Sequence, residues 1–198
     1  MDIKKSENIR LKLMKATVGI AGAGGLGSNA AISLARSGIG KLVIVDFDKV
    51  EESNLNRQYY FRNQIGKVKV DALKENIKKI NETIDIEIIN QKLVKDSMYK
   101  PFKDVDVVIE ALDAAEIKTN FIEEILLNLP DKPIIGASGV AGYGHSDRII
   151  TKKMGNLYIC YDESAKDSDE DVLMAPKVCL MANWQANLAL EIILGEDK

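Results

Sequence analysis

The 198-residue sequence predicts an α/β fold, a mostly parallel central sheet with helices on both faces. Two observations predict it. Short apolar runs alternate along the chain with longer segments of helical periodicity, and several of the runs are rich in Val and Ile with apolar residues on both faces. No internal repeat or long linker divides the chain. We therefore expect a single domain spanning 1–198, with an N-terminal helix or arm at 1–15.

The strands are expected where these apolar runs occur, at 16–21, 42–46, 84–89, 105–111 and 133–138. Apolar residues spaced three and four apart predict helices at 26–37, 67–80, 117–129 and 177–194. In the last helix we expect one apolar side made of Leu180 or Met181, Trp184, Leu188 and Ile192. Two further runs, 148–152 and 157–161, are expected to close the sheet as an antiparallel pair.

The composition excludes several classes of protein. Hydrophobic residues make up 46% of the chain, too many for a disordered protein, and two cysteines cannot build a disulfide scaffold. No secretory leader is visible, and no apolar run approaches the ~20 residues that cross a bilayer, so we expect a cytoplasmic protein without membrane attachment. The net charge of −3 and the lack of a basic stripe argue against nucleic-acid binding.

A glycine-rich motif, GAGGLG at 22–27, lies between the first predicted strand and the first predicted helix. Glycines there permit a tight turn and let backbone N–H groups approach a phosphate at a helix N-terminus. Asp46 ends the second predicted strand 19 residues later, where a carboxylate accepts hydrogen bonds from a ribose. This pattern predicts a Rossmann-like nucleotide site; the alternative is a turn that serves packing alone. The glycines concerned are Gly22, Gly24, Gly25 and Gly27.

The residues that follow decide between NAD, FAD and ATP. The carboxyl ends of parallel strands share one edge of a sheet, so Asp46 and Asp113 are expected to face the same crevice as the glycine loop. Cations and a further carboxylate suit a triphosphate with Mg²⁺ better than a pyrophosphate already held by backbone amides. The remaining candidate nucleotide-binding residues are Asp48, Ser53, Asn54, Arg57 and Lys69.

The segments GAGGLGS, VDFDKVEESNLNRQ, GKVKV, ALDA, APKV and QAN together resemble the ThiF/MoeB/ubiquitin-activating family of adenylyltransferases. Members of that family adenylate the C-terminal glycine of ubiquitin-like sulfur carriers. The resemblance covers about 17–195. Because the chain is short and shows no appended domain, it most resembles the thiamine-pathway branch that acts on the carrier ThiS.

The resemblance implies roles for individual residues. Gly24 and Gly25 would lie at the phosphates and Asp46 at the ribose. Asp113 would hold Mg²⁺, although Ala114 follows it where many relatives have a polar residue. Ser53, Asn54 and Arg57 would lie along the triphosphate with Lys69 beside them. Relatives are usually homodimers in which an arginine of the partner's N-terminal helix reaches the phosphates, and Arg10 is the candidate for that role.

The chemistry of an acyl-adenylate fits a chain with one histidine, His145, and no evident pair of nucleophile and base. A C-terminal carboxylate is already ionised at neutral pH, so its attack on the α-phosphorus of ATP needs charge neutralisation rather than a base. The resemblance then implies adenylation of a ThiS-like carrier ending in Gly-Gly, in thiamine thiazole biosynthesis. The alternatives are molybdopterin-type carrier activation, an NAD(P)-linked oxidoreductase, or a nucleotide-binding module without catalysis, in which Arg57 and Lys69 are ordinary solvated cations.

Two cysteines and an acidic segment stand apart from these motifs. Cys160 and Cys179 cannot form the four-cysteine zinc site that many relatives carry, so we expect no zinc. Either Cys160 takes the activated carrier covalently or it is a structural thiol. Residues 161–176 are expected to form a mobile acidic crossover loop, which either folds over a carrier tail or is simply solvated.

Overall fold

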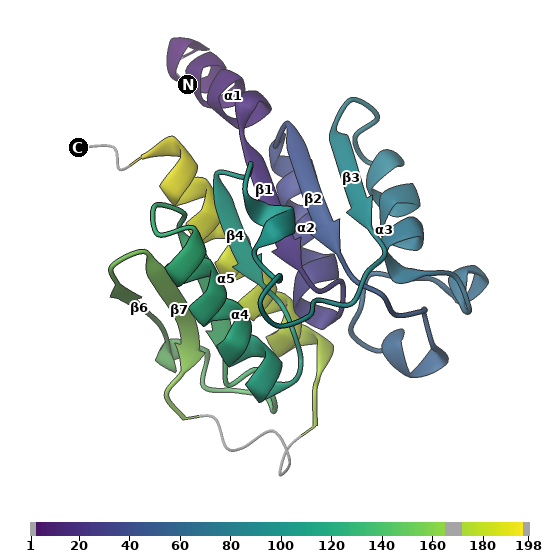
Figure 1. The fold of residues 1–198 in the computed structure, drawn as a ribbon. Coiled ribbons are helices and arrows are strands. Elements are labelled where there is room, and N and C mark those ends of the chain that lie inside the picture. The colour runs from purple at the N-terminus through teal and green to yellow at the C-terminus, as the bar shows by residue number, and fades with distance from the viewer. Residues whose placement is uncertain (1–2, 165–171, 196–198) are drawn as a thin grey trace.

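The computed structural model describes residues 3–164 and 172–195, built around a seven-stranded sheet in the order β3-β2-β1-β4-β5-β7-β6 (Figure 1). Neighbouring strands are parallel except β6 and β7, which pair antiparallel. The expected α/β fold and its antiparallel closing pair are confirmed. The strands are β1 (Thr17–Ala21), β2 (Lys41–Val45), β3 (Asp85–Ile89), β4 (Val107–Glu110), β5 (Ile134–Ser138), β6 (Ile149–Met154) and β7 (Leu157–Asp162).

The helices cover both faces of this sheet, as the alternating sequence pattern predicts. Helices α2, α3 and α5 contribute buried residues to one hydrophobic core, while α4 and the 3₁₀ turn η3 (Lys100–Phe102) contribute to a second core on the opposite face. In the ranges described, no helix is both long and apolar enough to cross a membrane. The helices are α1 (Ile3–Lys15), α2 (Gly25–Ser37), α3 (Lys69–Lys78), α4 (Ala115–Asn128) and α5 (Ala175–Leu194).

The expected apolar side of α5 is only partly right. Met181 and Leu188 are buried, but Leu180 and Trp184 are 37% and 38% exposed. The helix instead buries a face that contains Gln185, whose side-chain amide donates to backbone carbonyls of β4 and β5 at 2.9 and 3.1 Å. Trp184 lies at the edge of the buried face of α5, where its indole N–H donates to the hydroxyl of Thr151 in β6 at 2.7 Å.

Two ion pairs, each with a fully buried carboxylate, connect strand ends to helices. Glu110, the last residue of β4, lies 2.6 Å from the ammonium group of Lys118 on α4. Asp162, the last residue of β7, lies 2.6 Å from Lys177 in the first turn of α5, and both side chains are almost fully buried. Asp162 therefore belongs to the sheet and not to a solvated acidic loop, because burial of either charge is tolerable only with its partner present. The loop expected at 161–176 is thus too long at both ends, because 161–162 belong to β7 and 175–176 to α5; residues 165–171 lie outside the described residues.

Candidate nucleotide-binding site

The glycine loop joins β1 to α2 through a turn that two of its glycines make possible. Gly22 has a φ of +98°, and its N–H donates to the carbonyl of Val45 at 2.8 Å. A Cβ on Gly27 would lie 1.9 Å from the carbonyl oxygen of Gly22, so the helix can start this close to the strand only with glycine at that position. Gly22 and Gly27 are thus required by the backbone itself.

The other two glycines of the motif lie at the helix N-terminus. Gly25 packs beneath α5, since a Cβ there would come within 2.9 Å of Val178. Gly24 is the N-cap residue and offers no side-chain cap, so the first N–H groups of α2 have no side-chain acceptor from it. A Cβ on Gly24 would meet only the side-chain nitrogen of Gln58, at 3.8 Å. The surface above Gly24 is therefore free for an anion at a helix N-terminus.

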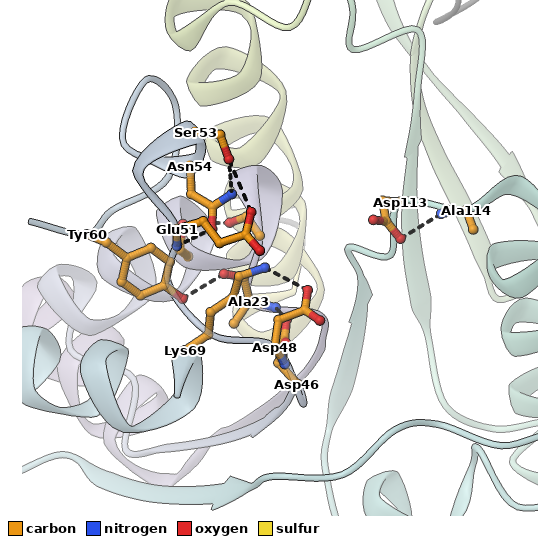
Figure 2. Close-up of polar contacts among 12 residues, drawn as sticks. Ala23, Asp46, Asp48, Glu51, Ser53, Asn54, Tyr60, Lys69, Asp113 and Ala114 are labelled. Atoms are coloured by element: carbon orange, nitrogen blue, oxygen red, sulfur yellow. Dashed lines mark hydrogen bonds and ion pairs between the residues drawn. The ribbon is translucent and has the colours of Figure 1, made fainter. Parts of the chain in front are cut away.

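Asp46 follows β2 directly and reaches the glycine loop. One carboxylate oxygen accepts the N–H of Ala23 at 2.6 Å and the other accepts the N–H of Asp48 at 2.8 Å. Lys69, at the start of α3, forms an ion pair with Asp48 at 2.8 Å, and its own side chain is only 8% exposed. Figure 2 shows these three side chains gathered beside Ala23, so the structure brings together an acidic and a basic candidate that the sequence alone could not pair.

Tyr60 holds the loop from the other side. Its buried hydroxyl donates to the carbonyl of Ala23 at 2.7 Å (Figure 2). Burial raises the pKa of this phenol well above its ordinary value, and the carboxylates of Asp46 and Asp48 raise it further. The hydroxyl therefore stays protonated and available as a donor at any physiological pH.

The SNLN part of the motif mainly stabilises its own turn. The side-chain oxygen of Asn54 accepts the N–H of Glu51 at 3.0 Å, and the hydroxyl of Ser53 donates to the Glu51 carboxylate at 3.3 Å. Arg57 donates through Nη1 to the carbonyl of Ser53 at 3.2 Å and to the side chain of Asn56 at 2.7 Å. The aliphatic stem of Arg57 lies beside Gly25, since a Cβ there would be 3.7 Å from its Cγ and 3.9 Å from its Cδ.

Asp113 is an exposed residue that follows β4, and its carboxylate accepts the N–H of Ala114 at 2.8 Å. Figure 2 shows it across the site from Asp46, Asp48 and Lys69. Within the described ranges, no three His, Cys, Asp or Glu side chains are grouped to hold a metal ion. One carboxylate nevertheless suits Mg²⁺ when substrate phosphates supply the other oxygens. The predicted magnesium role of Asp113 is therefore compatible with its surroundings.

Arg10 is exposed on α1, near the sulfur of Met14. Figure 1 shows α1 at the end of the sheet where β1 begins, whereas the glycine loop lies where β1 ends. Arg10 is therefore remote from the glycine loop of its own chain. Its role at the phosphates stays a prediction that requires a second subunit.

Gln58 is a site residue that the sequence reasoning left out, although it belongs to the SNLNRQ motif. Its amide nitrogen lies 3.8 Å from where a Cβ on Gly24 would be, and its side-chain oxygen is buried without a hydrogen-bond partner among the described residues. A buried polar atom without a partner costs free energy, which a bound ligand or water can recover. This unpaired oxygen can be satisfied only by a hydrogen-bond donor, such as a hydroxyl or amino group of a ligand or a water, and not by a phosphate oxygen.

The cysteines show no sign of activation. Cys160 is fully buried in β7, and burial raises the pKa of its thiol to about 12, against a smaller lowering by a hydrogen bond with Thr151. Cys179 is partly exposed on α5, and burial raises its pKa as well. A nucleophilic cysteine needs a lowered pKa, so the structure favours the structural interpretation of Cys160. His145 is exposed, with a φ of +51°.

Comparison with known proteins identifies the family. The model of the ThiF family matches residues 3–198. The chain belongs to the ThiF family. This establishes the family that the motifs indicate, whereas the thiamine-pathway branch within it remains a prediction.

Relatives of this ThiF-family chain carry two kinds of name. It is 31% identical over 193 residues to the adenylyltransferase and sulfurtransferase UBA4 of Kluyveromyces lactis, covering 94% of this chain and 43% of the relative. It is 38% identical over 132 residues to the tRNA threonylcarbamoyladenosine dehydratase of Bacillus subtilis, covering 65% of this chain and 51% of the relative. The chain thus spans about half the length, or less, of these relatives.

Among solved structures, the fold matches the Escherichia coli tRNA N6-threonylcarbamoyladenosine dehydratase TcdA in complex with AMP. The TM-score is 0.86 at 20% sequence identity, and the match covers 94% of this chain and 89% of that structure. At this level of identity the likeness concerns the fold.

Proposed function

We propose that this chain uses ATP to adenylate the C-terminal glycine carboxylate of a ubiquitin-like sulfur carrier, releasing pyrophosphate, and that the carrier is of the ThiS type. The observation that carries the proposal is the juxtaposition of an uncapped, glycine-lined helix N-terminus with Asp46, Lys69 and Arg57. Membership of the ThiF family and the adenylyltransferase name of the Kluyveromyces lactis relative support it.

In this reaction a carboxylate oxygen of the carrier forms a bond to the α-phosphorus while the bond from that phosphorus to the bridging oxygen breaks. Pyrophosphate leaves with the electron pair, so AMP becomes joined to the carrier as a mixed anhydride. The carboxylate is ionised at neutral pH, and no proton has to be removed from it. The enzyme therefore needs to align two anions and neutralise their charge.

Residues of this chain can meet that need. N–H groups at the start of α2 bind phosphate oxygens, and the side chain of Arg57 is held next to them by Ser53 and Asn56. The ammonium group of Lys69 is oriented by Asp48 and retains further donor hydrogens for an anion. Asp113 would hold Mg²⁺, which when bound neutralises phosphate charge and orients the leaving pyrophosphate.

A second candidate is an ATP-dependent dehydratase that acts on a modified tRNA nucleoside, favoured by the 38% identity to the Bacillus subtilis relative. The charge of the chain weighs against it. The net charge is −3, whereas a nucleic-acid backbone requires clustered Lys and Arg. Activation of a molybdopterin-type carrier uses the same site chemistry and is separated only by the choice of carrier.

The decisive experiment is intact-mass analysis of candidate carriers ending in Gly-Gly after incubation with the protein, ATP and Mg²⁺. We expect a ThiS-type carrier to gain the mass of one AMP, with release of pyrophosphate. Parallel reactions contain a molybdopterin-type carrier or tRNA bearing threonylcarbamoyladenosine. Loss of water from the tRNA with no carrier adenylated would establish the second candidate instead. Thermal stabilisation by NAD but not by Mg-ATP would point to an oxidoreductase and overturn both.

A further inference from the structure

Three consecutive backbone carbonyl groups in the glycine loop each accept a hydrogen bond from a side chain. Phosphate oxygens accept hydrogen bonds, so a carbonyl oxygen turned toward them would repel them, whereas an N–H group attracts them. The N–H of Ala23 is already donated to Asp46, so the N–H groups left to face a phosphate are those of Gly24 and Gly25 at the start of α2. The bonds are Tyr60 Oη to the Ala23 carbonyl at 2.7 Å, Ser28 Oγ to that of Gly24 at 2.6 Å, and Asn29 Nδ2 to that of Gly25 at 2.7 Å.

Asn29 does more than hold its own turn of α2. The same amide group donates to the carbonyl of Arg57 at 2.9 Å, across a separation of 28 residues in sequence. An amide NH₂ has two hydrogens, so it can make both bonds at once. Asn29 therefore fixes the backbone of Arg57 relative to Gly25, next to which the stem of Arg57 already lies.

The bond to Arg57 distinguishes Asn29 from side chains that only bond back along their own helix. The latter pattern occurs elsewhere in the chain, where Asn128 donates to the carbonyl of Glu124 at 2.9 Å and Thr119 to that of Ala115 at 2.9 Å. Such bonds affect one turn of one helix. Asn29 joins the two segments that supply the N–H groups and the guanidinium group of the site.

We propose that Asn29 is a positioning residue, which sets the spacing between the glycine loop and Arg57 and thereby the affinity for the phosphate chain of a nucleotide. The inference rests on the proposed ATP-binding role of the site but not on the identity of the carrier. Its effect is confined to the phosphates, because Asn29 contacts neither Asp46 nor another group assigned to the ribose.

The test compares Asn29→Leu with Asn29→Ser. Leucine is close to asparagine in size and removes both bonds. Serine can keep the bond to the Gly25 carbonyl, as Ser28 does to Gly24, but is too short to reach Arg57 as well. Asn128→Leu and Asn128→Ser are the matched controls, since Asn128 makes the same kind of helical bond at the far end of α4. Affinities for ATP and adenosine are measured by displacement of a fluorescent ATP analogue, and folding by chemical denaturation.

We expect both Asn29 variants to bind ATP about tenfold more weakly, which corresponds to the loss of roughly one hydrogen bond. Adenosine should bind to them as it does to the native protein. Native affinity in Asn29→Ser would overturn the inference, because the link to Arg57 would then be dispensable. Equal losses for ATP and adenosine would reduce Asn29 to a structural residue. A native protein that binds ATP but adenylates no carrier would refute the proposed function alone, whereas one that binds no ATP would refute both.

Discussion

Alanine at two glycines of the same loop should affect different properties: Gly27→Ala should lower the stability of the fold, whereas Gly24→Ala should lower the affinity for ATP. In Gly27→Ala the new Cβ would lie 1.9 Å from the backbone oxygen of Gly22, whereas ordinary contacts begin at 3.4 Å. The start of α2 would have to withdraw from β1 by about 1.5 Å, at a cost near the upper end of the ~1–3 kcal/mol typical of overpacked sites. The better helix propensity of alanine returns at most about 1 kcal/mol.

The expected net result is a loss of about 2 kcal/mol of unfolding free energy for Gly27→Ala, which in a protein of this size lowers Tm by roughly 4–8 °C. Gly24→Ala should stay within about 1 kcal/mol of the native protein, because its methyl group meets only Gln58 Nε2 at 3.8 Å. That methyl group would instead occupy the space assigned to a phosphate, and ATP affinity should fall at least about tenfold.

Urea denaturation measures the first effect and calorimetric titration with ATP measures the second. The pair of variants separates packing from ligand binding within one loop. The reasoning would be refuted if Gly27→Ala were as stable as the native protein. It would also fail if Gly24→Ala kept full ATP affinity, because the surface above Gly24 would then not be the phosphate site.

Three further predictions concern single residues. Arg57→Ala should raise the barrier to carrier adenylation by about 3–4 kcal/mol and slow pyrophosphate exchange roughly 10²–10³-fold; an unchanged rate would remove Arg57 from the site. Cys160, buried and with a pKa of about 12, should resist iodoacetamide in the native protein at neutral pH, and peptide mass spectrometry showing rapid labelling would contradict its burial. Burial alone would raise the pKa of Asp162, but Lys177 and Ser164 hold it at about 2, against 3.8 ordinarily. The ion pair should therefore stabilise the fold above pH 3.8 and lose that contribution as the pH falls towards about 2. Across this window the free energy of unfolding should fall more steeply for the native protein than for Asp162→Asn. Parallel pH profiles of the two proteins would argue against a stabilising pair.

Most of the fold could be predicted from the sequence because periodicity reflects burial directly. Each of the seven expected strands and the four expected helices after residue 15 is present, with ends within two residues of the expected ones. What the apolar pattern does not predict is the polar groups in the interior. Glu110 lies in an apolar run and Gln185 on the buried face of α5, and each is tolerated because of a partner on another element. Local pattern contains no information about such partners.

The candidate site could be predicted as a set of residues but not as a network. The sequence predicts that the glycine motif, Asp46 and Asp113 lie at one edge of the sheet, because the carboxyl ends of parallel strands share that edge. The network depends on side-chain geometry between segments distant in sequence. It includes the ion pair of Lys69 with Asp48, the hydrogen bond from Tyr60 to the carbonyl of Ala23 and the unpaired side-chain oxygen of Gln58. The signals available in the sequence are an asparagine two residues after the glycine motif, Asn29, and a glutamine directly after Arg57, Gln58.

The ion pair between Asp162 and Lys177 joins the end of β7 directly to the start of α5, on the two sides of the segment that connects them. Because Asp162 and Lys177 bind each other, the two ends of the connection are held together independently of the residues between them. Lengthening a connection whose ends are fixed costs little entropy. Changes in the length or charge of this connection should therefore have little effect on the free energy of unfolding, as long as Asp162 and Lys177 are kept.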